Sequence, residues 1–158
     1  MGKSTQNSKT RLQALLNEPE IRAAILQDAA RFEDLILLIV SIYLTPGARG
    51  PLFVTLFSHV LSFNQRVELL KNLPFRRRPK SMECIHTIKL IQRLRNYVAH
   101  PRMIIRKPVN ILDEPRIQEL FINYPESYRT AIRKANKQLY LIGNMKETLR
   151  YHLGGNDA

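Results

Sequence analysis

The chain has 158 residues, of which 44% are hydrophobic and 24% are charged. That length and apolar content suit one folded domain and exclude a disordered or low-complexity chain. With 25 Lys and Arg against 13 Asp and Glu, the net charge is +12, which favours a polyanionic partner, nucleic acid first, unless the charge serves solubility alone.

The cysteine content and the apolar runs bear on the compartment. Cys84 is the only cysteine, which excludes a disulfide framework and a zinc site built from cysteines. We expect it to be a buried structural thiol. The first ten residues are polar, without the apolar segment of a signal peptide, and the longest apolar run, 35–44, is about half of a bilayer span. The sequence therefore predicts a cytoplasmic protein with no membrane partner.

The first part of the chain is predicted to contain one long helix. Residues 1–18 form a polar, basic lead-in, with a short helix expected at about 11–16. The stretch from Glu20 to Leu44 is strongly helical, and its C-terminal half is apolar all round, as in a helix surrounded by others. Its apolar positions recur every three or four residues: Ile21, Ile25, Ala29, Phe32, Ile36, Ile39 and Tyr43.

A second helical region covers residues 52–73. Ser62 is a candidate N-cap for a new helix within it, and Pro74 ends it. The loop "FRRRPK" at 75–80 follows and has two interpretations, a solvated connector or a patch that contacts phosphates. Its cationic side chains are Arg76, Arg77, Arg78 and Lys80.

The rest of the chain is also predicted to be helical. Ser81 is expected to cap a helix over 82–99, which His100-Pro101 ends. Residues 101–112 read as a loop with an extended piece, 114–121 as a short helix, and Glu126 to about Leu153 as the last long helix. No useful β-alternation appears. We predict an all-α antiparallel helical bundle of four to five helices in a single domain over 19–153, with a disordered tail at 154–158.

Arg95 is unexpected in the helix over 82–99. At about 100° per residue, Arg95 lies about 20° from Ile88, which is the centre of the apolar arc. One interpretation is structural, with Arg95 binding helix-end carbonyls or an acid such as Glu33 or Asp34. The other places Arg95 and His100 in a cleft, where they act on an anion. The predicted arc consists of Cys84, Ile85, Ile88, Ile91, Val98 and Ala99.

The stretch "RNYVAH" at 95–100 resembles the R-x(4–6)-H motif of the HEPN superfamily. "SFNQRVELLKNL" and "IKLIQRLRNYVAHP" resemble the two central helices of many HEPN domains, including relatives of the mannitol operon repressor. The likeness covers about residues 30–101 and implies a dimeric helical bundle. In active members the Arg and His of two subunits meet in one cleft and cut RNA without a metal. By position the catalytic residues would be Arg95, Asn96 and His100.

The resemblance also implies a chemistry. His100 would move a proton, Arg95 would hold the phosphate, and Asn96 would orient His100 or contact phosphate. Arg93, Arg102 and the 76–80 loop would bind the RNA backbone. One subgroup of antitoxin-paired members carries a tyrosine two residues after the His, where this chain has Arg102, so nucleotidyl modification there is not expected. No cofactor or metal is expected, because the four histidines lack ligand spacing.

Two functions follow from these predictions. The first is a metal-independent endoribonuclease, acting as a toxin or defence effector, with RNA, a second copy of the chain and a protein antitoxin or regulator as partners. The alternative is a non-catalytic helical protein, either a regulator like the mannitol operon repressor or a nucleic-acid-binding scaffold.

Overall fold

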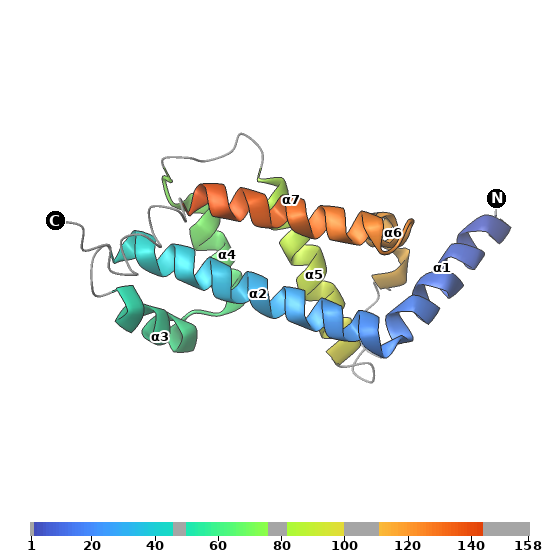
Figure 1. Ribbon diagram of the computed structural model, residues 1–158, viewed down its shortest axis with the longest axis horizontal. Helices are drawn as coiled ribbons and strands as arrows, with labels where there is room; N and C mark the ends of the chain where they lie inside the picture. The colour runs from blue at the N-terminus through green and yellow to red at the C-terminus, as the bar shows by residue number, and fades with distance from the viewer. Residues whose placement is uncertain (1, 46–49, 76–81, 100–110, 144–158) are drawn as a thin grey trace. The chain divides into compact units, whose positions relative to one another are not determined.

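The computed structural model describes residues 2–45, 50–75, 82–99 and 111–143, and the side chains of 8–45, 53–75, 82–99 and 111–143. These ranges contain α-helices, one 3₁₀ helix and no strand, so the predicted all-α class is confirmed (Figure 1). The helices are α1 (Gly2–Asn17), α2 (Pro19–Leu44), α3 (Gly50–Val60), α4 (Phe63–Asn72), α5 (Glu83–Ala99), η2 (Ile111–Asp113), α6 (Pro115–Phe121) and α7 (Glu126–Ile142).

The described chain has seven α-helices, more than the four to five predicted. One reason is α1, which covers Gly2–Asn17 where only a short helix at about 11–16 was expected. Leu12 and Leu16 lie one turn apart on α1 and are both buried, so this segment packs on the protein. The end predicted for the last helix, near Leu153, and the tail at 154–158 lie outside the described residues.

The other reason is the break between α3 and α4, which Ser62 makes as predicted. Ser62 has an extended backbone, with φ −64° and ψ 158°, and its hydroxyl accepts a hydrogen bond from the Gln65 N–H. Gln65 Oε1 accepts in turn from the Ser62 N–H at 2.8 Å. This reciprocal capping box satisfies two backbone donors that the first turn of a helix leaves free.

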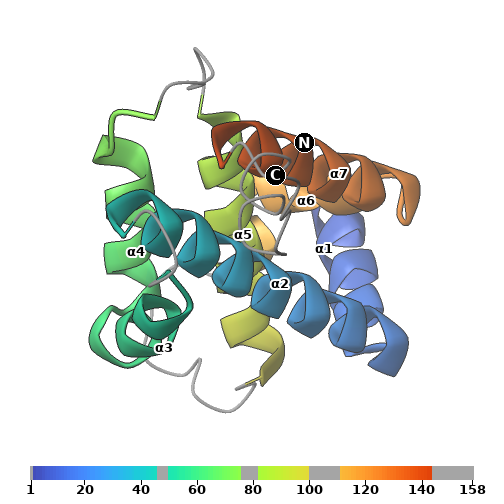
Figure 2. The same ribbon diagram turned by 60° about the vertical axis from the view of Figure 1, so that its left-hand side comes forward.

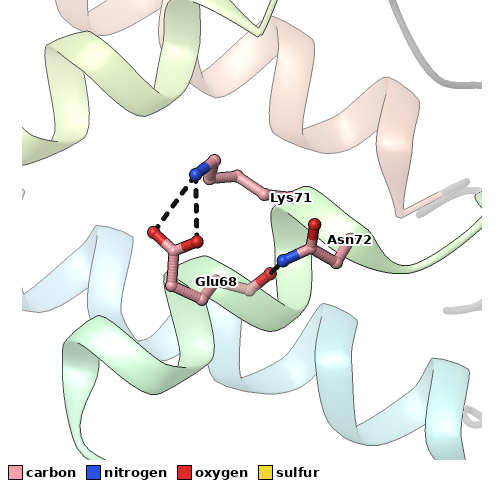
Figure 3. A network of polar contacts seen from close by, with 3 residues as sticks. All are labelled: Glu68, Lys71 and Asn72. Atoms are coloured by element: carbon pink, nitrogen blue, oxygen red, sulfur yellow. Dashed lines mark hydrogen bonds and ion pairs between the residues drawn. The ribbon is translucent and has the colours of Figure 1, made fainter.

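The end of α4 is fixed by its own side chains (Figure 3). Asn72 Nδ2 donates to the Glu68 carbonyl at 2.8 Å, and Lys71 Nζ lies 2.9 Å from Glu68 Oε2. The next residue, Leu73, is extended, and Pro74 follows it. The predicted stop at Pro74 is therefore confirmed, because proline cannot continue the helical hydrogen bonds.

The apolar stripe predicted on α2 is buried at all positions except the last. Ile21, Ile25, Ala29, Phe32, Ile36 and Ile39 are buried. Tyr43 is 38% exposed. Its ring packs on Phe75 with centroids 4.6 Å apart, and its hydroxyl donates to the Pro74 carbonyl. A phenol keeps its polar end accessible in this way while its ring contacts apolar neighbours.

The chain divides into two compact units, which we describe separately. The first consists of Met1–Ala30 and His86–Lys134. In it α1, η2 and α6 pack together, and Lys9 forms an ion pair with Asp113. Tyr128 of α7 donates a hydrogen bond to Asp28 Oδ2 of α2 at 3.0 Å, and burial raises the pKa of this phenol, with the Asp28 carboxylate adding to the effect.

The second unit consists of Arg31–Ile85 and Ala135–Ala158. It holds the C-terminal part of α2, all of α3 and α4, the first residues of α5 and the end of α7. Its buried side chains include Phe32, Ile36, Val67, Leu70 and Leu139. The unit boundaries fall inside α2, α5 and α7, so no loop in the chain marks them.

None of the helices in the described ranges is long and apolar enough to cross a bilayer.

Candidate nucleic-acid interface

Helix α5 carries the described residues of the candidate site. It begins at Glu83, where a carboxylate suits the positive end of the helix dipole, and ends at Ala99. Gln138 Oε1 of α7 accepts a hydrogen bond from the Cys84 N–H at 2.8 Å and so satisfies a donor of the first turn. The predicted boundaries of this helix are thus nearly correct. The predicted cap, Ser81, lies outside the described residues.

Arg95 lies at the edge of the buried stripe of α5. Near the end of the helix the buried side chains are Ile91, Leu94 and Val98, while Arg95 is half-buried. At about 100° per residue, Arg95 is about 65° from the centre of those three. The predicted arc was therefore drawn too far toward Arg95. Its inclusion of Ala99 was wrong, because Ala99 is exposed.

The guanidinium of Arg95 contacts the neighbouring Asn96. Arg95 Nη1 donates to Asn96 Oδ1 at 3.1 Å. Among the described residues of the same unit, no carboxylate lies within ion-pair distance of Arg95. Two of the three predicted catalytic side chains are therefore together on the last turns of α5. An amide and a guanidinium side by side offer several N–H donors to an anion.

A different arginine binds the carbonyls at the end of α5. Arg22 of α2 is half-buried, and its Nη2 donates to the Val98 carbonyl at 2.7 Å. The last four carbonyls of a helix lack partners within the helix, and a cation there is also favoured by the helix dipole. One of the structural roles considered for Arg95 is thus carried out by Arg22. Sequence reasoning missed Arg22, because the contact joins residues 76 positions apart.

Arg93, predicted to bind the RNA backbone, is paired with an acid. Its Nη1 lies 2.9 Å from Glu114 Oε2, and the two side chains are 44% and 26% exposed. Glu114 directly precedes α6, so the ion pair joins α5 to the segment that leads into α6. Arg93 can reach a phosphate only in competition with Glu114.

The remaining predicted site residues lie outside the described residues. They are His100, Arg102, Arg76, Arg77, Arg78 and Lys80.

Cys84 and His86 take no part in the candidate site. Cys84 is 1% exposed, and burial raises the pKa of its thiol to about 11, against the lowering by neighbouring backbone N–H groups. A thiol with a raised pKa is a poor nucleophile, because little of it is thiolate at neutral pH. This agrees with the prediction that Cys84 is a buried structural residue. His86 is exposed. In the described ranges no group of three or more His, Cys, Asp or Glu side chains is placed to hold a metal ion.

A cavity of about 460 Å³ lies between α1 and α6, and sequence reasoning missed it. On each helix the lining residues recur with a spacing of three or four, so one stripe of α1 faces one stripe of α6. Periodicity identifies such stripes, but it does not tell which two stripes face each other. The lining consists of Ser8, Arg11, Leu12, Leu15, Pro115, Gln118, Glu119, Phe121 and Ile122.

No protein-family model matches the sequence, and no curated protein or solved structure is significantly similar to it. The resemblance to HEPN domains therefore stays a prediction that the residues of "RNYVAH" carry.

Proposed function

We propose that the protein binds RNA at the end of α5 and cleaves it with Arg95, Asn96 and His100. The observation that carries the proposal is that two arginines, Arg22 and Arg95, make different kinds of contact. Arg22 takes the Val98 carbonyl, while Arg95 bonds only to the adjacent Asn96 amide within the described part of its unit. Arg95 is half-buried and precedes His100 by five positions in the sequence. In a chain of charge +12, such an arginine suits a phosphodiester.

The proposed reaction is a transesterification within the RNA chain. His100 takes the proton from a ribose 2′-OH, and the 2′-oxygen forms a bond to the adjacent phosphorus. The bond from phosphorus to the 5′-oxygen breaks, and that oxygen receives the proton that His100 took up. The products are a 2′,3′-cyclic phosphate and a 5′-hydroxyl. Arg95 stabilises the charge on the non-bridging oxygens as the five-coordinate phosphorus forms, and Asn96 holds Arg95 in place.

The wider setting is also a proposal. We propose an antiparallel helical bundle that dimerises, so that a twofold axis brings two copies of Arg95 and His100 into one groove. The protein would work in the cytoplasm without a membrane partner, as a toxin or defence effector that a protein antitoxin or regulator restrains. The reduced Cys84 thiol suits a reducing compartment.

Cleavage of labelled RNA in EDTA tests the proposal. We expect Arg95→Ala and His100→Ala each to lower the rate by at least about a hundredfold. Arg133→Ala and His86→Ala are matched controls, since they remove the same side chains from exposed positions on α7 and α5, and both should cleave like the wild type. Identical RNA patterns from the wild type and the two site variants would exclude catalysis at this site.

Two variants, Arg22→Ala and Arg95→Ala, distinguish a structural arginine from a ligand-binding one. Arg22→Ala should lower the free energy of unfolding by about 1–3 kcal/mol, because it leaves the Val98 carbonyl without its charged donor. Arg95→Ala should change it by less than about 0.5 kcal/mol. Urea unfolding measures both. A larger loss for Arg95→Ala than for Arg22→Ala would return Arg95 to a structural role.

The alternative function, a non-catalytic regulator or nucleic-acid scaffold, uses the same surface. It is favoured by the bond that Arg95 already makes to Asn96, because a side chain held in place without a ligand suits a preformed binding surface. RNA that is retained but uncut by the wild type, and released by Arg95→Ala, would support it.

A further inference from the structure

Helix α3 is apolar and yet not buried. Its sequence, GPLFVTLFSHV, contains no Lys, Arg, Asp or Glu. Of its side chains at 53–60, the part that the structure describes, none is buried. Leu56 is 50% exposed and Val60 is 63% exposed. Large apolar side chains on a helix without charged residues are normally covered by other elements, so the exposure of Leu56 and Val60 calls for a partner.

The helix is also held firmly in this orientation. Arg66 of α4 donates from Nε to the Leu61 carbonyl at 2.8 Å and from Nη2 to the Ser58 carbonyl at 2.9 Å, which caps the end of α3. The rings of Phe53 and Phe57 pack on each other with centroids 5.6 Å apart. In both views α3 lies beside the C-terminal part of α2 and the start of α4 (Figures 1 and 2). The exposed apolar residues therefore form a fixed surface.

We propose that this surface is where two copies of the chain meet, with α3 packed on α3 of the second copy. Two molecules of charge +12 repel each other, and the repulsion is smallest where the surface has no charged side chains. α3 itself has no charged side chain, and the Arg66 guanidinium lies at its C-terminal end, on the Ser58 and Leu61 carbonyls. In a twofold contact each copy presents the same residues, so an uncharged apolar row, such as Leu56 and Val60 one turn apart, is complementary to itself.

The composition of α3 fits a second copy better than a lipid surface. Helices that lie in a membrane interface carry Lys or Arg along their polar face. The polar residues of α3 are Thr55, Ser58 and His59, none of them a fixed cation. With a length of about 16 Å, α3 offers a small contact, and Tyr43 and Leu44 of the same unit are exposed as well. We therefore expect a dimer that depends on concentration.

This inference rests on the proposed function, because it names the contact surface of the dimer proposed there. The evidence for the surface itself is the exposure of α3. The test compares Leu56→Gln/Val60→Gln with the control Ile122→Gln/Leu141→Gln. The match is close, because Ile122 is 64% exposed and Leu141 is 48% exposed. Glutamine keeps the net charge unchanged in both variants.

Sedimentation equilibrium over a range of concentrations gives the dimer dissociation constant. We expect the wild type and the control to agree, and the α3 variant to dimerise at least about tenfold more weakly. A wild type that stays monomeric throughout overturns the inference, as does an equal constant for the two double variants. Circular dichroism checks that each variant is folded. If the double variant does not fold, the single variants Leu56→Gln and Val60→Gln are measured in its place.

Two further readouts separate the explanations. If the wild type is monomeric and binds phosphatidylserine vesicles, and the α3 variant does not bind them, α3 is a lipid-binding surface instead. RNA cleavage by an α3 variant that is monomeric would contradict the proposed shared groove, while the α3 contact stands. If the wild type dimerises through α3 but never cuts RNA, only the ribonuclease proposal fails.

Discussion

At the scale of single residues, Cys84 shows two opposed electrostatic effects on one thiol. It lies in the first turn of α5, where the backbone N–H groups of Ile85 and Cys84 favour a thiolate. It is also 1% exposed, and burial disfavours the charged form. Burial prevails, because the pKa rises from the ordinary 9.0 to about 11. The thiol is therefore protonated at physiological pH, as suits a side chain in the apolar core.

The raised pKa of Cys84 predicts a loss of stability in alkali. Since the folded protein holds the proton more tightly than the unfolded chain, its contribution is complete below about pH 9 and is lost as the pH rises toward about 11, by up to about 3 kcal/mol. Cys84→Ala should lose less stability over this range than the wild type. Urea unfolding at about pH 8 and about pH 10 measures the difference. Tyr128, with a raised pKa of its own, is present in both proteins and does not affect the comparison. Parallel curves would contradict the assignment.

At the scale of elements, the start of α4 depends on the Ser62 capping box. Ser62→Ala removes the acceptor of the Gln65 N–H and should lower the free energy of unfolding by about 1 kcal/mol. Ser58→Ala is the control, because Ser58 is exposed inside α3 and its hydroxyl bonds to the Thr55 carbonyl of the same helix. It should leave stability unchanged or slightly raised. The midpoint of urea unfolding distinguishes the two, and equal midpoints would show that the box contributes nothing.

The range over which residues interact decides which elements and contacts the sequence predicts. The Ser62 cap, the stop at Pro74 and the stripe of α2 depend on neighbours within a turn or two, so short patterns reveal them. The bond from Arg22 to Val98 joins distant segments, and no local pattern distinguishes Arg22 from a surface arginine. The exposure of α3 was missed for the same reason, since an apolar helix reads as core until its neighbours are known.

The candidate site follows the same division. The periodicity of α5 identified Arg95 as unusual, and its bond to the adjacent Asn96 is local. The ion pair that engages Arg93 is not, because Glu114 lies beyond a stretch without helical pattern. A count of cations near "RNYVAH" therefore overstates the positive charge that this part of the molecule offers to RNA.

At the scale of the whole molecule, some of the cations that give the chain its net charge of +12 make contacts within the protein. Arg22 and Arg66 bind backbone carbonyls, and Lys9 and Arg93 pair with Asp113 and Glu114. A cation bound to a carbonyl keeps its charge, and its field still draws a polyanion toward the protein. A cation paired with a carboxylate is locally neutral and releases few counterions when RNA binds. Pairing, more than the number of cations, thus sets how strongly binding depends on salt.

This argument predicts that removing one acid strengthens RNA binding. Glu114→Gln releases Arg93 from its ion pair, so one more phosphate contact becomes available and the slope of log affinity against log salt should steepen by about 0.7. Glu119→Gln makes the same change in net charge, but the described residues give Glu119 no cationic partner, so it should leave the slope as in the wild type. Titrations of labelled single-stranded RNA at several salt concentrations measure both slopes. If the two variants shift the slope equally, net charge governs binding and Arg93 has no place in the interface; a steeper slope for Glu114→Gln alone places Arg93 beside the RNA backbone.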